Sequence, residues 1–154
     1  MAEDCSRLRA AWSKSTDEQN VFESYLMALQ VCLGAALQCS FGAAPSSLIV
    51  LPANRVLTGT PAANIMDNKA IVNVPPFGMC SSMANPTVAS ATAAALGVLT
   101  PMPCVPVTPA PWVPGAPTVL IAEMPALDNS CKLMCAWGGV IQITAPGQAT
   151  VEIP

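Results

Sequence analysis

Cysteine is the residue type in this sequence that is best suited to chemistry. The chain holds seven cysteines and no histidine. Four of the cysteines adjoin a predicted turn or a proline, which would present each thiol from the end of a loop. They are Cys39, Cys80, Cys104 and Cys135. Four thiolates suit tetrahedral zinc, and a bound ion would supply folding free energy directly. The sequence contains no CxxC, so buried thiols without a metal stay an open alternative.

The other three cysteines fit a shared metal site less well. Cys131 and Cys135 would point to one face of a strand but lie about 13 Å apart, too far to share an ion unless that segment were helical. Cys32 and Cys39 would face opposite sides of a continuous strand. Cys5 lies in a polar N-terminal stretch, where exposure is the simplest expectation.

The residues that are missing exclude most enzyme classes. Without histidine there is no Ser-His-Asp or Cys-His catalysis and no histidine-ligated metal. The acidic residues after position 30 are isolated in the sequence, so no carboxylate pair indicates general acid–base work. They are Asp67, Glu123, Asp128 and Glu152. We therefore predict that the protein is not an enzyme; a thiol hydrolase or redox protein is the disfavoured rival.

Charge and compartment narrow the partners. The net charge is −3 and the six basic residues are spread thinly, so we expect no nucleic-acid binding. The N-terminus is charged and lacks the apolar core of a signal peptide. The apolar run 25–37 is too short to span a bilayer. We expect folding in the cytoplasm with reduced thiols, and a secreted disulfide scaffold is disfavoured by the odd cysteine count.

Two regions differ in composition. Residues 1–30 hold eight of the fifteen charged residues and no proline or glycine. Ser15 and Glu18 form a capping box, followed by Val21, Tyr25 and Leu29 at helical spacing. We predict a helical extension over 1–30, with one helix from about 16 to 30. All sixteen prolines occur at or after Pro45, which predicts a mainly β domain of short hairpins over 31–154.

The elements that must position the cysteines can be placed along this domain. We expect strands where β-branched and apolar residues lie between turn signals. Their ranges are 31–39 (broken at Gly34), 47–51, 71–74, 119–122 and 140–144. Asn85 as N-cap, Pro86 at the first turn and Gly97 near the end predict a short helix over 87–96.

A series of short motifs runs in order from about residue 31 to the C-terminus. Together, these motifs resemble the cysteine-type branch of the PAAR-like spike-tip family. The motifs are Gly34-Ala35-Ala36-Leu37-Gln38-Cys39-Ser40-Phe41-Gly42, Pro45-Ser46-Ser47-Leu48, Asn64-Ile65-Met66-Asp67, Pro76-Phe77-Gly78-Met79-Cys80, Asn85-Pro86, Pro103-Cys104-Val105-Pro106, Pro111-Trp112-Val113-Pro114-Gly115, Pro125-Ala126-Leu127, Cys135-Ala136-Trp137-Gly138-Gly139-Val140-Ile141 and Pro146-Gly147-Gln148.

The resemblance implies a small metal-stapled cone that caps and sharpens the trimeric VgrG-type spike of a contractile injection system, such as a type VI secretion system. Such a tip helps to puncture target membranes and to deliver effectors, contacts the membrane transiently and leaves the bacterial cytoplasm on the spike without a signal peptide. One tip would sit on each trimer.

The resemblance also implies that Cys39, Cys80, Cys104 and Cys135 are the metal ligands, with zinc as the ion and iron as the alternative. The rival reading is an effector adaptor, in which the helix within 1–30 docks a separate cargo protein.

Overall fold

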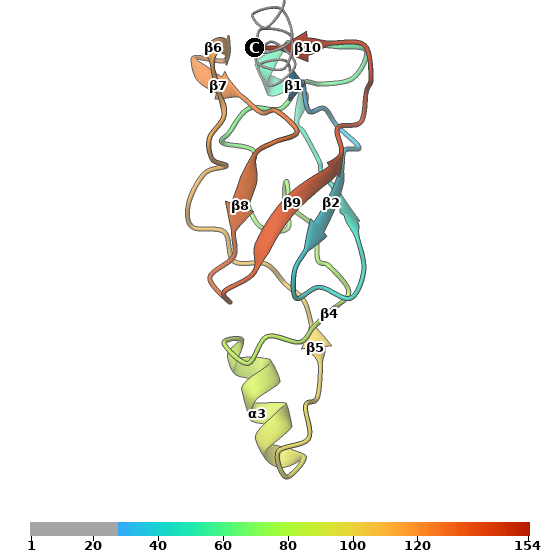
Figure 1. The fold of residues 1–154 in the computed structure, drawn as a ribbon, viewed down its shortest axis with the longest axis vertical. Helices are drawn as coiled ribbons and strands as arrows, with labels where there is room; N and C mark the ends of the chain where they lie inside the picture. Colours follow the sequence, from blue (N-terminus) through green and yellow to red (C-terminus); the bar gives the residue numbers. More distant parts are fainter. Residues whose placement is uncertain (1–27) are drawn as a thin grey trace, which may run out of the picture.

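The computed structural model describes residues 28–154. This part of the chain is elongated and tapers from a broad end to a narrow end (Figure 1). We call residues 81–103 the apical segment, because they form the narrow end. The remaining described residues, 28–80 and 104–154, form the body. The predicted helix over residues 16–27 and Cys5 lie outside the described residues.

A four-stranded antiparallel sheet is the main element of the body. Its strands run in the order β3-β2-β9-β8. Their bounds are Ser46–Ser47 (β3), Ala36–Cys39 (β2), Val140–Ala145 (β9) and Lys132–Met134 (β8). Leu37 pairs with Ile143, and Leu133 with Ile141, across this sheet. Alternation along the strands places Leu37, Leu133 and Ile141 on the buried face.

The broad end is built from shorter pairings. Strands β1 and β10 pair with each other, β6 and β7 form a hairpin, and the 3-10 helix η1 lies nearby (Figure 1). Their bounds are Ala28–Leu29 (β1), Glu152–Ile153 (β10), Ala116–Ile121 (β6), Met124–Ala126 (β7) and Pro52–Asn54 (η1). A bridge between Leu57 and Pro61 closes the loop after η1.

The narrow end is one excursion of the chain. Strands β4 (Met79–Cys80) and β5 (Met102–Pro103) pair as a neck, and helix α3 (Pro86–Ala94) lies beyond it. Asn85 caps α3 by accepting a hydrogen bond from the Thr87 amide at 3.1 Å. Pro86 at the first turn lacks only a donor that a helix start leaves unpaired. The predicted helix is thus confirmed, two residues shorter at its C-terminal end.

Buried polar side chains link distant parts of the body. The Gln30 amide nitrogen donates to the carbonyls of Val31, Ala63 and Leu127 at 2.9–3.2 Å. The Trp112 indole donates to the Asp67 carbonyl at 3.0 Å. Among the described residues, no buried side-chain nitrogen or oxygen lacks a hydrogen-bond partner. These contacts fix loops that regular strands do not reach.

The structure corrects several predicted elements. Residues 28–30, predicted as the end of a helix, are extended, and β1 pairs with β10. The predicted strand 71–74 is a series of turns, and the strand predicted over 47–51 is reduced to β3. The mainly β fold is confirmed, and the predicted strands 119–122 and 140–144 correspond to β6 and β9. In the described part of the chain, no helix is long and apolar enough to cross a membrane.

Candidate metal centre

Cys39 and Cys135 lie at the same end of the four-stranded sheet. Cys39 is the last residue of β2 and pairs with Ile141 of β9. Cys135 begins the tight loop between β8 and β9, in which its amide donates to the Gly139 carbonyl at 2.8 Å. Cys135 follows β8, and β9 lies between β8 and β2, so the two cysteines lie at the same end of the sheet on the two sides of the start of β9. Both thiols lie at strand ends next to a loop, as the sequence predicted.

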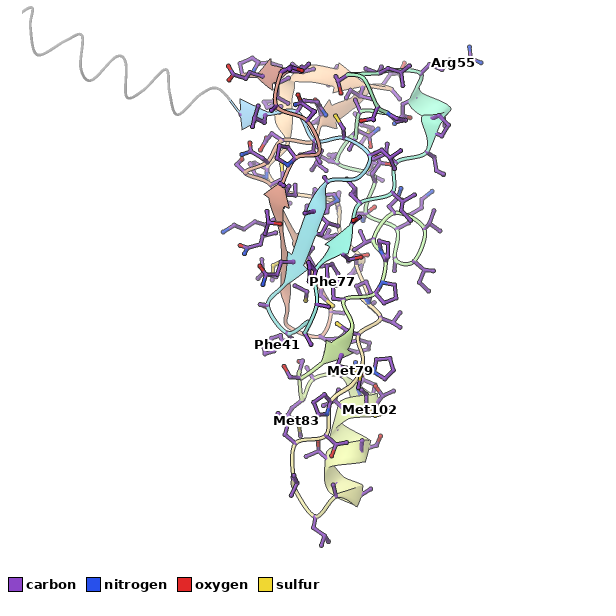
Figure 2. All side chains as sticks on the ribbon, turned by 90° about the vertical axis from the view of Figure 1, so that its right-hand side faces the viewer. Phe41, Arg55, Phe77, Met79, Met83 and Met102 are labelled. Carbon is purple, nitrogen blue, oxygen red and sulfur yellow. The ribbon has the colours of Figure 1, made fainter. Side chains whose placement is uncertain are left out.

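Cys80 and Cys104 lie on the two sides of the neck. Cys80 in β4 pairs with Met102 in β5, and the Cys104 amide donates to the Gly78 carbonyl at 2.7 Å. A bridge between Gly42 and Cys80 connects the neck to the turn that follows β2. These two cysteines flank the apical segment in the sequence. Met79 and Met102 of the neck lie where the body meets the narrow end (Figure 2), and Cys80 pairs with Met102.

The four predicted ligands form one buried, electrostatically linked cluster. All four are buried and belong to the main hydrophobic core. Burial raises the pKa of the Cys39 thiol, and the neighbouring Cys135 and Cys80 raise it further. Burial and the nearby Cys80 raise the pKa of Cys104 to about 12. Neighbouring thiolates repel one another, so the ionised cluster needs a cation, and the raised pKa values of Cys39 and Cys104 favour the protonated form of these two thiols at neutral pH.

Two glycines leave room around this cluster, and the sequence prediction did not assign them that role. A Cβ at Gly139 would lie 3.0 Å from the Cys39 sulfur. A Cβ at Gly42 would lie 2.5 Å from the Phe77 Cβ and 3.3 Å from the Cys39 Cβ. Gly138, which precedes Gly139, has a positive φ of 76° in the turn. In both sequence motifs the glycine follows a cysteine of the cluster closely: Gly42 follows Cys39, and Gly139 follows Cys135. This proximity was the signal that could have identified the two glycines.

The cluster is not in a ligating arrangement. Within residues 28–154, no three cysteine or acidic side chains come close enough together to hold a metal ion. The six cysteines of these residues are free thiols, and none forms a disulfide. Cys131 instead accepts a hydrogen bond from the Gly115 amide at 3.2 Å, and Cys32 lies 2.6 Å from the Thr58 hydroxyl. The prediction that a bound metal holds the fold together is therefore not shown by this structure.

The comparisons with known proteins give one result. Residues 31–148, well over half of the chain, match a family described as a domain of unknown function (DUF4280). The chain belongs to this family. No curated protein and no solved structure matches it. The DUF4280 match includes all four clustered cysteines but stops short of β1 and β10, which pair with each other just outside it.

Side chains next to the cluster hold the apical segment of this DUF4280 protein against the β8–β9 loop. The Ser82 hydroxyl donates to the Trp137 carbonyl at 2.5 Å, and the Trp137 indole donates to the Val105 carbonyl at 3.1 Å. The Trp137 side chain is partly buried and packs against the main core. Ser82 was not singled out, because a serine beside a predicted turn carries no distinctive signal.

The donor set fits a soft divalent metal by its chemistry. Four cysteine sulfurs are the set that zinc and iron accept in tetrahedral sites, and Gly139 leaves space beside the Cys39 sulfur. Cys39, Cys80, Cys104 and Cys135 would hold the ion. Once bound, it would supply folding free energy and a joint between the sheet and the neck.

Proposed function

We propose that the protein is a non-enzymatic tip that caps and sharpens the trimeric VgrG-type spike of a contractile injection system, so that it helps to puncture target membranes and to deliver effectors. The observation that carries the proposal is the tapered shape (Figure 1). A body rich in strand pairings narrows to a single helical excursion. In this proposal the broad end seats on the spike and the apical segment leads.

The broad end supports a seat on a trimer. The β1–β10 pair, the β6–β7 hairpin and the loop closed by Leu57 and Pro61 all lie there (Figure 1). Two of these elements expose large apolar side chains: Leu57 in the loop is 66% exposed, and Leu120 in the β6–β7 hairpin is 61% exposed. One chain on a three-fold partner is a symmetry mismatch, and three separate elements at the broad end are a means of contacting three subunits with one copy.

The thiol cluster supports a structural role rather than a catalytic one. Its cysteines are buried in the core, and the pKa values of Cys39 and Cys104 are raised, which disfavours the nucleophilic thiolate. We propose zinc, with iron as the alternative, as the ion bound by the four thiolates. The ion would fix the neck to the strand ends and limit bending of the apical segment.

The test is assembly with a VgrG-type trimer, measured by native mass spectrometry and by pull-down. We expect one tip for each trimer, and the replacements Leu57→Asp and Leu120→Asp are expected to weaken capping at least about tenfold by placing charge in an apolar contact. The matched control is Leu96→Asn at the narrow end, which should cap normally. Three tips per trimer, or broad-end variants that cap like the wild type, would contradict the proposal.

A further inference from the structure

The apical segment lies within a long uncharged part of the chain. No charged residue occurs between Lys69 and Glu123. Every charged residue of the described chain therefore belongs to the body. Arg55, for example, is at the broad end, far from Met83 beside α3 (Figure 2). The narrow end can enter an apolar medium without carrying any charge into it.

The end of this segment exposes large aliphatic side chains. Leu96 is 97% exposed, and Val98, Leu99 and Met83 are also exposed. Leu96, Val98 and Leu99 belong to the turn that follows α3, and this turn forms the extreme narrow end (Figure 1). Met83 precedes α3 and lies near the neck (Figure 2). Exposed leucines are common singly, but a contiguous apolar end with no charge around it marks an interaction surface.

Leu96 is also held in a backbone conformation that disfavours leucine. Its φ is 58°, in the left-handed region, and Gly97 follows with φ 89°. Glycine or asparagine ends helices in this conformation at lower cost. A strained residue that buries nothing gives no benefit to folding, so its benefit lies in what the side chain contacts outside the chain.

Many polar groups of the apical segment have partners within the protein. Beyond α3, the amides of Leu96, Gly97 and Val98 donate to carbonyls of the helix end, and the Thr100 amide donates to the Thr92 hydroxyl at 3.1 Å. Every serine and threonine hydroxyl between 81 and 100 has a partner within the protein. They are Ser81, Ser82, Thr87, Ser90, Thr92 and Thr100. These bonds reduce the number of polar groups that lose hydrogen bonds to water when the segment enters an apolar medium.

We propose that residues 96–99 insert into the apolar interior of a lipid bilayer, with Leu96 entering first. The tapered end is convex, and its hydroxyl groups and the amides of Leu96, Gly97 and Val98 are bonded within the chain, which suits lipid better than a hydrogen-bonding protein partner. Because the segment lacks charge, binding needs no anionic headgroup. The proposal rests on the proposed function for delivery of this end to a membrane, but lipid binding itself requires no spike.

The experiment is flotation of the full-length protein with phosphatidylcholine vesicles. We expect the wild type to float with the vesicles, and Leu96→Asn with Leu99→Asn to reduce the bound fraction at least about tenfold. Asparagine accepts a positive φ, so the thermal midpoint of the double variant should be no lower than that of the wild type. Leu57→Asn and Leu120→Asn, which remove exposed leucines at the broad end, serve as controls and should float like the wild type.

Other outcomes would overturn the inference. Binding that requires anionic lipid or disappears in 0.5 M salt, about a 4 Å screening length, would assign the contact to charge. Self-association lost in the Leu96→Asn variant, without vesicle binding by the wild type, would assign the surface to a second copy. Normal capping of the spike with no vesicle binding would overturn the lipid contact while keeping the proposed function. Vesicle binding without capping would do the reverse.

Discussion

The body holds all the charged side chains of the described residues and buries its largest apolar ones, whereas the apical segment carries no charge and exposes leucine, valine and methionine. The body is closed by pairings between residues far apart in the chain, such as β2 with β9. The apical segment is closed by local hydrogen bonds around α3. Long-range strand pairing therefore stabilises the body, and local hydrogen bonds stabilise the apical segment. The thiol cluster lies where the two regions meet.

The largest effect on stability is expected from substitutions in the thiol cluster, where the body and the apical segment meet. Replacing Cys80 with serine is expected to remove bound zinc or iron and to lower the free energy of unfolding by roughly 3 kcal/mol or more, because a structural metal contributes its binding energy to folding. Metal content by mass spectrometry and urea unfolding measure both effects. The same loss is expected for Cys39, Cys104 and Cys135.

Cys131→Ser is the matched control for these variants. Cys131 is as buried as the four cysteines of the cluster but accepts a hydrogen bond from Gly115, which a serine hydroxyl can also accept. We expect this variant to keep one ion per chain. A wild-type protein purified from cytoplasm that is metal-free and stably folded would rule out the four-thiolate site.

The next prediction compares two N-terminal deletions, one that ends before the body and one that removes its first residues. Removing residues 1–27 should leave unfolding and capping of the spike unchanged, whereas removing 1–30 should destabilise the body by roughly 2–4 kcal/mol. The second deletion takes away β1 and Gln30, whose amide donates to three carbonyls at the broad end. Thermal unfolding and capping compare the two.

The shorter deletion also tests the adaptor reading. Loss of a co-purifying effector with capping intact would support docking of cargo by residues 1–27. Loss of capping would instead assign these residues to the spike contact. Equal stability of the two deletions would contradict the boundary at Ala28.

A smaller effect of opposite sign is expected at the narrow end. Leu96→Asn should raise the free energy of unfolding by about 0.5–1 kcal/mol, because asparagine tolerates the left-handed conformation better than leucine. Leu57→Asn at the broad end, equally a loss of an exposed leucine, should change it by less than about 0.5 kcal/mol. Urea unfolding of both variants at one pH checks this. A destabilised Leu96→Asn would mean that leucine packs at this turn after all.

The sequence predicted the elements whose signals are local. The cap at Asn85 and the apolar pattern of 140–144 correspond to observed elements, and turns beside four cysteines located the thiol cluster. The failures have specific causes. Residues 28–30 fit a helical pattern, but their partners, residues 152–153 of β10 among them, lie more than a hundred positions away.

Residues 71–74 fail for a different reason. They read as a strand because three of the four are β-branched, but the Asn73 side chain accepts from the Lys69 amide and donates to the Ile49 carbonyl. These bonds offer the backbone an alternative to a ladder. Ile71 adopts a φ of 69°, which no strand allows. Strain at Ile71 and Leu96 depends on tertiary contacts or on external partners, and residue type alone does not reveal it.

The last prediction is a pH dependence of stability within the body. Burial, and less strongly the Asp128 carboxylate, raise the pKa of the Cys131 thiol from 9.0 to about 11. In the unfolded chain this thiol loses its proton near pH 9, whereas the folded protein keeps it until about pH 11. The folded state therefore binds more protons over this range, and its stability falls as the pH rises from about 9 to 11.

Serine does not ionise there, so Cys131→Ser should show a shallower fall in urea midpoints measured from pH 8 to 10.5. Because Asp128 also accepts from the Ser130 amide at 2.7 Å, its orientation is fixed independently of the thiol, and the difference in slope between variant and wild type reports Cys131 alone. Identical slopes would place the alkaline sensitivity of the body in other groups.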